Sequence, residues 1–151
     1  MNITSSELSR LQGLNHKPRT LSALIDRTRK GKILFALPFP PSVNDYWGKT
    51  KRGFVFLKPA ARKYKKAVEL VLTRSGFGVY PTKDKVSLKI VSHKSDARRY
   101  DIDNLLKALL DSMKGRVFVD DFDVDEITIK RGEIDRDNPR VEIEVMRIAS
   151  E

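Results

Sequence analysis

Apolar side chains alternate with other residues along four stretches of the chain, a pattern typical of half-buried β-strands. The alternating apolar positions are Ile33, Phe35 and Leu37; Val86, Leu88 and Ile90; Ile127 and Ile129; and Val141, Ile143 and Val145. The first stretch begins at Lys32 and must end at residues 38–41, which contain three prolines and cannot continue a hydrogen-bonded strand. Residues 135–139, between the last two stretches, have the composition of a turn.

Two longer segments carry apolar residues at helical spacing. The first begins at Pro59, ends before Gly76 and has a stripe formed by Tyr64, Ala67, Val68, Val71 and Leu72. The second ends at Gly115 and has a stripe formed by Leu105, Leu106, Ala108, Leu109, Leu110 and Met113. The resulting order is β-α-β-α-β-β. It predicts a single α/β (α+β) domain in which two helices pack on a small mixed sheet.

The first 31 residues lack this regular pattern. They carry Ser, Thr, Asn and basic residues with scattered leucines, so we interpret them as an N-terminal extension, either an arm or one or two short helices. Residues 32–151 are the predicted domain, and a chain of 151 residues is long enough to bury one core unaided.

Composition narrows the possible chemistry. With no Cys, the chain cannot form disulfides, Cys-based zinc sites or thiol nucleophiles, and its two histidines, His16 and His93, are far apart in sequence. It has no signal-peptide core and is too polar for a membrane protein, so we expect a cytoplasmic protein without a membrane partner.

The formal net charge of +10 is unevenly distributed along the chain. Residues 1–30 have 6 Lys/Arg and 2 Asp/Glu, residues 31–100 have 16 and 4, and residues 101–151 have 8 and 14. A strongly basic region favours a polyanionic partner. The acidic final third is either a solvated surface or a cation site.

Several acids lie close together in sequence around the second predicted helix. Asp103, Lys107 and Asp111 are spaced i, i+4, i+8, and Asp101 lies just before the helix. A short return of the chain after Gly115 would bring Asp120 and Asp121 beside them. The simpler alternative is that Asp103 caps the helix and forms a weak surface ion pair with Lys107.

Converging carboxylates without Cys or paired His are a ligand set for a hard cation such as Mg²⁺. Such an ion can activate water and neutralise phosphate charge, while a lysine such as Lys107 stabilises the developing charge. A D/E-x-K tripeptide, a P-loop and a dinucleotide-binding glycine motif are all absent. Serine–histidine catalysis would have to recruit one of two isolated histidines.

Basic and aromatic residues outside the acidic cluster are candidates for DNA contact. The loop of residues 42–56 combines positive charge with Tyr46 and Trp47, which either stack on bases or pack on the core. The candidate DNA-binding residues are Asn44, Lys49, Lys51, Arg52, Arg62, Lys65, Lys66, Arg98 and Arg99.

Two motifs in the chain resemble the RusA family of Holliday-junction resolvases, the crossover junction endodeoxyribonucleases. The first is LPFPPS at residues 37–42, followed by Asn44 and by Tyr46 and Trp47. The second is RYDIDNLLK at residues 99–107, continuing through Asp111 to the paired acids. The resemblance covers residues 32–147.

The resemblance implies that Asp101, Asp103 and Asp121 are essential metal-binding acids, that Lys107 is the catalytic lysine and that Asp120 contributes beside Asp121. It also implies a Mg²⁺-dependent homodimer that resolves four-way DNA junctions in recombination and repair, encoded by bacteria, prophages or phages. The chain differs at Tyr100, where a basic residue is common, and at Asp123, where glutamine is frequent.

Two rival functions remain at the level of sequence. A non-catalytic DNA-binding or architectural protein would use the acids only as caps and solubility residues. A nuclease acting on RNA or flapped DNA would use the same acids on a different substrate.

Overall fold

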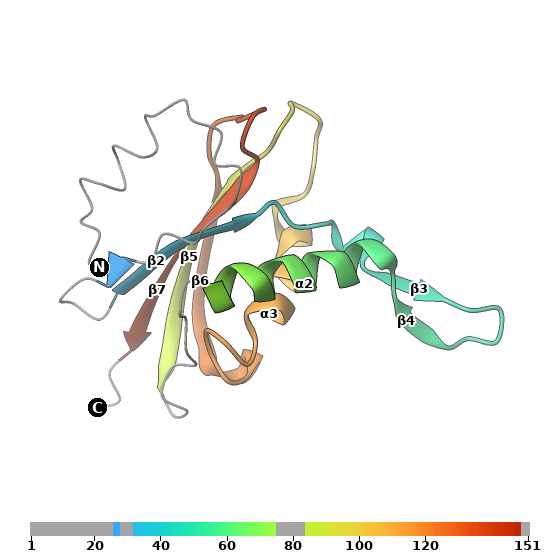
Figure 1. The fold of residues 1–151 in the computed structure, drawn as a ribbon, viewed down its shortest axis with the longest axis horizontal. Helices are drawn as coiled ribbons and strands as arrows, with labels where there is room; N and C mark the ends of the chain where they lie inside the picture. The colour runs from blue at the N-terminus through green and yellow to red at the C-terminus, as the bar shows by residue number, and fades with distance from the viewer. Residues whose placement is uncertain (1–25, 28–31, 75–83, 149–151) are drawn as a thin grey trace.

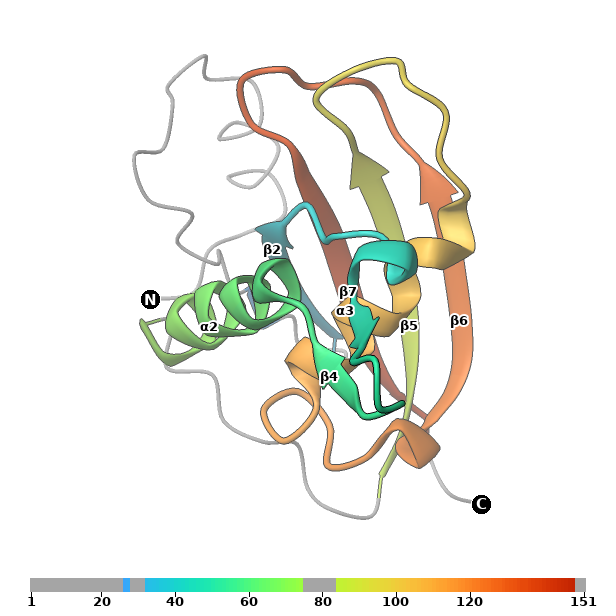
Figure 2. The same ribbon diagram turned by 90° about the vertical axis from the view of Figure 1, so that its right-hand side faces the viewer.

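The computed structural model describes residues 26–27, 32–74 and 84–148, and these form a five-stranded sheet with two helices on one face (Figures 1 and 2). The strand order is β1-β2-β7-β5-β6, and only β5 and β6 pair in parallel. The strands are β1 (Asp26–Arg27), β2 (Lys32–Pro38), β5 (Lys85–His93), β6 (Val124–Arg131) and β7 (Arg140–Ile148). The predicted mixed sheet with two packed helices is confirmed.

The sheet buries most of the alternating apolar residues on the face covered by the helices, but Ile127 of the edge strand β6 is 37% exposed. In β2 and β7, Phe35 pairs with Ile143 and Leu37 with Val141, and all four side chains are buried. Ile90 of β5 lies on the other side of Ile143. The alternation arises because successive side chains of a strand point to opposite faces.

Both predicted helices are present. Helix α2 (Pro59–Arg74) begins at the predicted proline and buries Tyr64, Val68 and Leu72 against the sheet. Helix α3 (Leu106–Met113) is preceded by a 3-10 turn, η2 (Ile102–Leu105), and Gly115 follows with φ +81°. The acids at residues 101 and 103 therefore lie before the α-helix rather than on it.

A β-hairpin that the sequence pattern did not predict projects from the domain beside the start of α2 (Figure 1). Its strands are β3 (Trp47–Lys49) and β4 (Val55–Leu57), preceded by the 3-10 turn η1 (Val43–Asp45). Tyr46, at the base of the hairpin, is fully buried, whereas Trp47 is exposed. One aromatic of the loop therefore packs on the core and its neighbour does not.

Part of the predicted N-terminal extension and the predicted end of α2 at Gly76 lie outside the described residues. The described piece of the extension, β1, pairs with β2 as a short edge strand. None of the described helices is long and apolar enough to cross a membrane.

Candidate active site

The buried base of the hairpin, helix α3 and the 3-10 turn η3 (Asp121–Asp123) meet around the hydroxyl of Tyr46. That hydroxyl donates a hydrogen bond of 2.5 Å to Asp111 Oδ2, although the two residues are 65 positions apart. The other carboxylate oxygen, Asp111 Oδ1, lies 3.1 Å from Lys107 Nζ one helical turn earlier. Asp111 thus joins a buried tyrosine to the predicted catalytic lysine.

Tyr46 remains a proton donor in this arrangement. Burial of the phenol, then its hydrogen bond to Asp111 and the charges of Asp111 and Asp121, raises the pKa of Tyr46 well above its ordinary value. The charge of Asp121 is the smallest of these contributions, after burial, the hydrogen bond and the charge of Asp111. Lys107 and Asp111 differ in exposure, with 42% and 17% of the side chain accessible, so the ammonium group reaches solvent while the carboxylate is largely enclosed.

Asp121 carries the unpaired polar atom of this region. Its Oδ1 is buried and has no hydrogen-bond partner among the described residues. A carboxylate oxygen removed from water without a partner is unfavourable, because its desolvation is not compensated. The atom is therefore suited to a cation.

The neighbouring Asp120 is engaged differently. It is the N-cap of η3: its carboxylate accepts from Phe122 N, and Asp123 Oδ2 in turn accepts from Asp120 N at 3.1 Å. Asp120 also lies 3.3 Å from Lys114 Nζ, and this cation, together with the Phe122 amide, lowers the pKa of Asp120. Asp120 therefore caps the turn, whereas Asp121 keeps an unpaired carboxylate oxygen.

Asp101 is the N-cap residue of η2 and Asp103 lies within the turn, and both are exposed. Asp101 makes no capping hydrogen bond from its side chain, and Asn104 Nδ2 lies 3.5 Å from Asp101 Oδ2. Among the described residues, no three His, Asp or Glu side chains are grouped closely enough to enclose an ion by themselves. The alternative interpretation, an ion pair between Asp103 and Lys107, is not found among the described residues, where Lys107 pairs with Asp111 instead.

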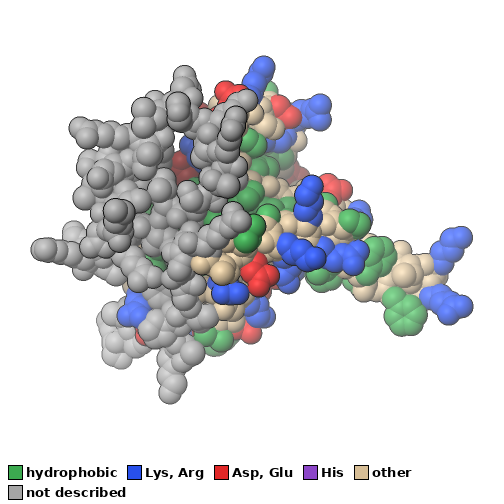
Figure 3. Space-filling model, in the orientation of Figure 1, with side chains coloured by type: hydrophobic (Ala, Val, Ile, Leu, Met, Phe, Trp, Pro, Cys, Tyr) green, Lys and Arg blue, Asp and Glu red, His purple; other side chains and the backbone are tan. Residues whose placement is uncertain are grey.

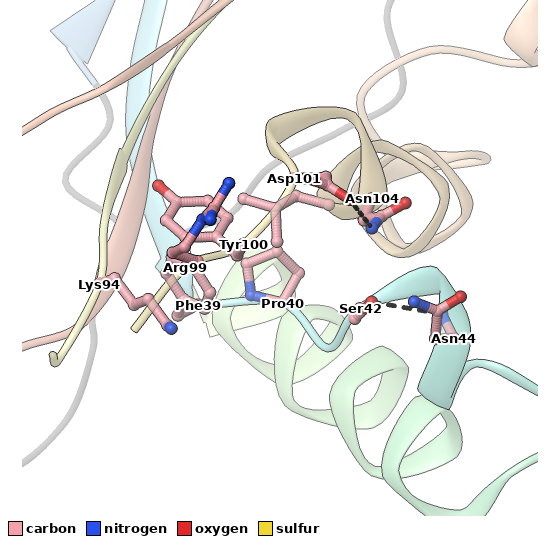
Figure 4. A pocket seen from close by; sticks show the side chains of 10 residues that line it. Phe39, Pro40, Ser42, Asn44, Lys94, Arg99, Tyr100, Asp101 and Asn104 are labelled. Carbon is pink, nitrogen blue, oxygen red and sulfur yellow. Dashed lines mark hydrogen bonds between the residues drawn. The ribbon is translucent and has the colours of Figure 1, made fainter. Parts of the chain in front are cut away.

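An open hollow of about 560 Å³ lies beside Asp101 (Figure 4). Asn44 from η1 and Arg99 from the loop before η2 face into it, so the structure brings these two predicted DNA-binding residues to the predicted acid. The remaining lining residues are Phe39, Pro40, Ser42, Lys94, Tyr100, Asn104 and Leu105.

A second hollow of about 410 Å³ shares Asp101 with the first and is lined by Lys94, Arg98, Arg99 and Arg131, among others. Tyr100 organises these cations. Lys94 Nζ and the Arg131 guanidinium lie 5.2 and 5.0 Å from its ring, and its hydroxyl shares a 2.7 Å hydrogen bond with Ser92. The residue that departs from the family pattern thus positions two cations that the sequence pattern did not single out.

Most of the other predicted DNA-binding residues belong to the hairpin and α2, and blue side chains follow these two elements on the face shown in Figure 3. Lys49, Lys51 and Arg52 belong to the hairpin and are exposed; Arg62, Lys65 and Lys66 are exposed on α2. Residues 46–68 contain eight Lys or Arg and no Asp or Glu. This stretch therefore carries positive charge that no acid within it offsets.

Comparison with known proteins places this arrangement in a family. The family described as endodeoxyribonuclease RusA matches residues 38–146. A crossover junction endodeoxyribonuclease rusA of Enterobacteria phage HK97 is 35% identical over 99 residues, which cover 65% of this chain and 81% of the phage protein. The residues matched by the family include η1, the hairpin, both helices and all the candidate acids.

Proposed function

The chain belongs to the RusA endodeoxyribonuclease family, and from that premise we propose that it resolves four-way DNA junctions in recombination and repair. The observation that carries the proposal is the unpaired, buried oxygen of Asp121 near the network that holds Lys107. An unpaired carboxylate oxygen and a lysine held by Asp111, in a domain with many exposed Lys and Arg side chains, suit hydrolysis of a nucleic-acid backbone.

We propose Asp101, Asp103 and Asp121 as the residues that hold Mg²⁺. All three offer carboxylate oxygens, the donors that hard cations prefer, and Asp121 Oδ1 lacks any other partner among the described residues. The absence of a closed carboxylate cage in the described region fits this ion, because Mg²⁺ keeps several waters and binds through few carboxylates together with substrate phosphates. When bound, it supplies a water of lowered pKa and neutralises phosphate charge.

Lys107 is proposed to donate to a non-bridging oxygen of the scissile phosphate and to offset the charge that develops there. Asp111 holds the ammonium group, and Tyr46 holds Asp111 from the buried side. Because both Asp111 oxygens already accept hydrogen bonds, Asp111 is proposed as a positioning residue and not as a metal ligand. A lysine whose rotamer is fixed before substrate arrives loses less entropy on binding.

The cations around Asp101 are proposed to hold the DNA strand. Arg99 and Lys94 line both hollows beside Asp101, so a phosphodiester bound there lies next to the acids. The exposed lysines of α2 and the hairpin extend the phosphate contacts along a neighbouring arm. We also propose a homodimer, because two symmetric cuts require two identical sites on a quasi-symmetric junction.

The direct test is to incubate the purified protein with a synthetic four-way junction and Mg²⁺ and to follow strand cleavage. We expect paired cuts by the wild type and none by Asp103→Asn, because the substitution removes a proposed ligand charge with little change of shape. Full activity of Asp103→Asn would remove Asp103 from the site.

The same assay separates the rival functions. A purely architectural protein would bind the junction without nicking it, whatever the Mg²⁺ concentration. A nuclease for other substrates would cut a flap, linear duplex, single strands or RNA as fast as the junction. We expect the junction to be cut at least about tenfold faster than these, a difference of roughly 1.4 kcal/mol in transition-state stabilisation.

A further inference from the structure

The β3–β4 hairpin exposes apolar side chains that the rest of the domain does not cover. Phe54, Val55 and Phe56 are 69, 57 and 43% exposed, and Trp47 at the start of β3 is 43% exposed. The hairpin stands clear of the sheet and α2, with hydrophobic and basic side chains together at its end (Figures 1 and 3). Exposed aromatic residues on a projecting element indicate a binding surface.

The turn that carries Phe54 is a defined structure. Thr50 O accepts from Gly53 N at 2.9 Å, and Gly53 adopts φ +87°, a conformation that favours glycine. Thr50 N donates to Phe54 O at 2.9 Å, while Thr50 Oγ1 accepts from Phe54 N at 3.1 Å. Both backbone polar groups of Phe54 are therefore held by one residue, and its ring is exposed close in sequence to Lys51 and Arg52.

The base of the hairpin is fixed to the candidate active site. Lys58 N donates to Tyr46 O at 2.9 Å, and Tyr46 donates from its side chain to Asp111. The rings of Tyr46 and Trp47 meet edge to face, 5.0 Å apart. The direction of the hairpin is thus set by the residue that also anchors Lys107.

Either a second copy of the chain or DNA could cover this surface, and the charge of the hairpin favours DNA. In an isologous dimer the same patch meets itself, so a contact between two hairpins would bring Lys49, Lys51 and Arg52 against their own copies. No acid occurs between residues 46 and 68 to offset that repulsion. DNA offers a partner for both kinds of exposed side chain, because its phosphates bind the cations and its base faces stack on the aromatic rings.

We propose that the hairpin recognises the branch point of the junction, with Phe54 stacking on a base exposed there while Lys51 and Arg52 contact the flanking phosphates. The bases of linear duplex are stacked on each other and offer no free face to Phe54, whereas a branch point exposes bases at lower cost. The hairpin therefore contributes to selectivity for branched DNA. This inference rests on the proposed function and assigns the selectivity for branched DNA over linear duplex to the hairpin, a surface separate from the candidate acids.

The test compares wild type, Phe54→Ala and Leu70→Ala in binding to a four-way junction and to linear duplex of the same sequence. Leu70 is the matched control, because it is 50% exposed on α2 and its removal also deletes exposed apolar surface. We expect Phe54→Ala to bind the junction about tenfold more weakly and to keep its duplex affinity, the effect expected for one base-stacking interaction. Leu70→Ala should match the wild type on both.

A 2-aminopurine placed at the branch point reports base unstacking directly. Its fluorescence should rise with wild type and Leu70→Ala and stay low with saturating Phe54→Ala. An unchanged affinity ratio and an unchanged fluorescence rise for Phe54→Ala would overturn the inference. Conversion of a dimer to a monomer by Phe54→Ala would also overturn it, by assigning the hairpin to a protein interface.

Failure of the inference and failure of the proposed function give different results. If wild-type protein cuts the junction and Phe54→Ala discriminates equally well, only the role of the hairpin is wrong. If wild-type protein shows neither cleavage nor preference for the junction, the proposed function itself is wrong. Melting temperatures of the three proteins should agree closely, because Phe54 and Leu70 bury little surface.

Discussion

The side chain of Asp111 occupies the position on which the site's organisation depends. Its two oxygens are used by Tyr46 and Lys107, which come from a buried hairpin base and an exposed helix face. Helical spacing predicts the contact with Lys107, because i and i+4 residues share a face. The contact with Tyr46 joins residues 65 positions apart and depends on how η1 packs against α3, which no local pattern reveals.

The first prediction concerns Tyr46→Phe, which removes one hydroxyl and keeps the ring. We expect kcat to fall by roughly tenfold with KM nearly unchanged, because Lys107 keeps its charge but loses the fixed position of Asp111. Single-turnover cleavage of a junction separates the effect on kcat from the effect on KM. A variant with wild-type kcat would show that Tyr46 only fills space.

The second prediction concerns stability at alkaline pH. The folded protein raises the pKa of Tyr46 and, through burial, that of Tyr64, so above about pH 10 the unfolded chain loses protons that the folded protein keeps. Their contribution is fully present below pH 10 and is lost as the pH rises further. The melting temperature of Tyr46→Phe should therefore fall less steeply than that of wild type between pH 9 and about pH 11. Melting temperatures that fall equally steeply with pH in the two proteins would contradict this prediction.

At the scale of elements, the turn η3 holds Asp121 in place. Asp120 and Asp123 cap it reciprocally, and Lys85 lies 3.9 Å from Asp123 and 3.8 Å from Asp125. The side chains around Asp121 thus satisfy one another and leave its Oδ1 unpaired among the described residues. Asp123 supplies the second cap of this turn.

The third prediction is that Asp123→Ala lowers cleavage while Asp125→Ala does not. Loss of the cap should cost about 1 kcal/mol of stability and should misplace Asp121, lowering kcat by roughly fivefold or more. Asp125→Ala is the matched control, since it loses the same cationic neighbour without opening the capping box. Equal activities of the two variants would show that the cap does not position Asp121.

The sequence predicts the long elements and misses the short ones for a physical reason. Apolar and other side chains alternate over seven to nine residues in β2, β5 and β7, and α2 has several turns. Each of these elements is therefore long enough for its buried face to produce a regular spacing of apolar residues in the sequence. β3 and β4 have three residues each and remain mostly exposed, so no alternation marks them. Helical spacing predicts Asp103 on the same helix as Lys107, with Asp101 just before it. The structure places Asp103 in the 3-10 turn η2, and both acids are exposed.

At the scale of the whole molecule, the basic side chains and the candidate acids lie mostly on different elements. Positive side chains follow the hairpin and α2 (Figure 3), while the candidate acids belong to or adjoin η2, α3 and η3. The net charge of +10 conceals a basic first part and an acidic last third. Under the proposed function, the first attracts the DNA backbone and the second receives the cation.

The fourth prediction follows from that separation. Replacing Lys65 and Lys66 on α2 by Gln should flatten the plot of log affinity against log salt by up to about 0.9 for each phosphate that is no longer neutralised. Lys130→Gln is the control, since Lys130 is exposed on the opposite face of the sheet from Ile129. Equal slopes for the double variant and wild type would exclude α2 from the DNA surface.

Asp121 is proposed to hold the catalytic cation while its neighbour Asp120 caps a turn, and a comparison of the two residues distinguishes these roles. Junction cleavage is measured at saturating Mg²⁺ for wild type, Asp121→Asn and Asp120→Asn, which remove the same charge one residue apart. Because asparagine also caps a turn, Asp120→Asn should retain activity within about threefold, whereas Asp121→Asn should lose roughly a thousandfold or more. Wild-type cleavage by Asp121→Asn, or equal losses in the two variants, would contradict the account.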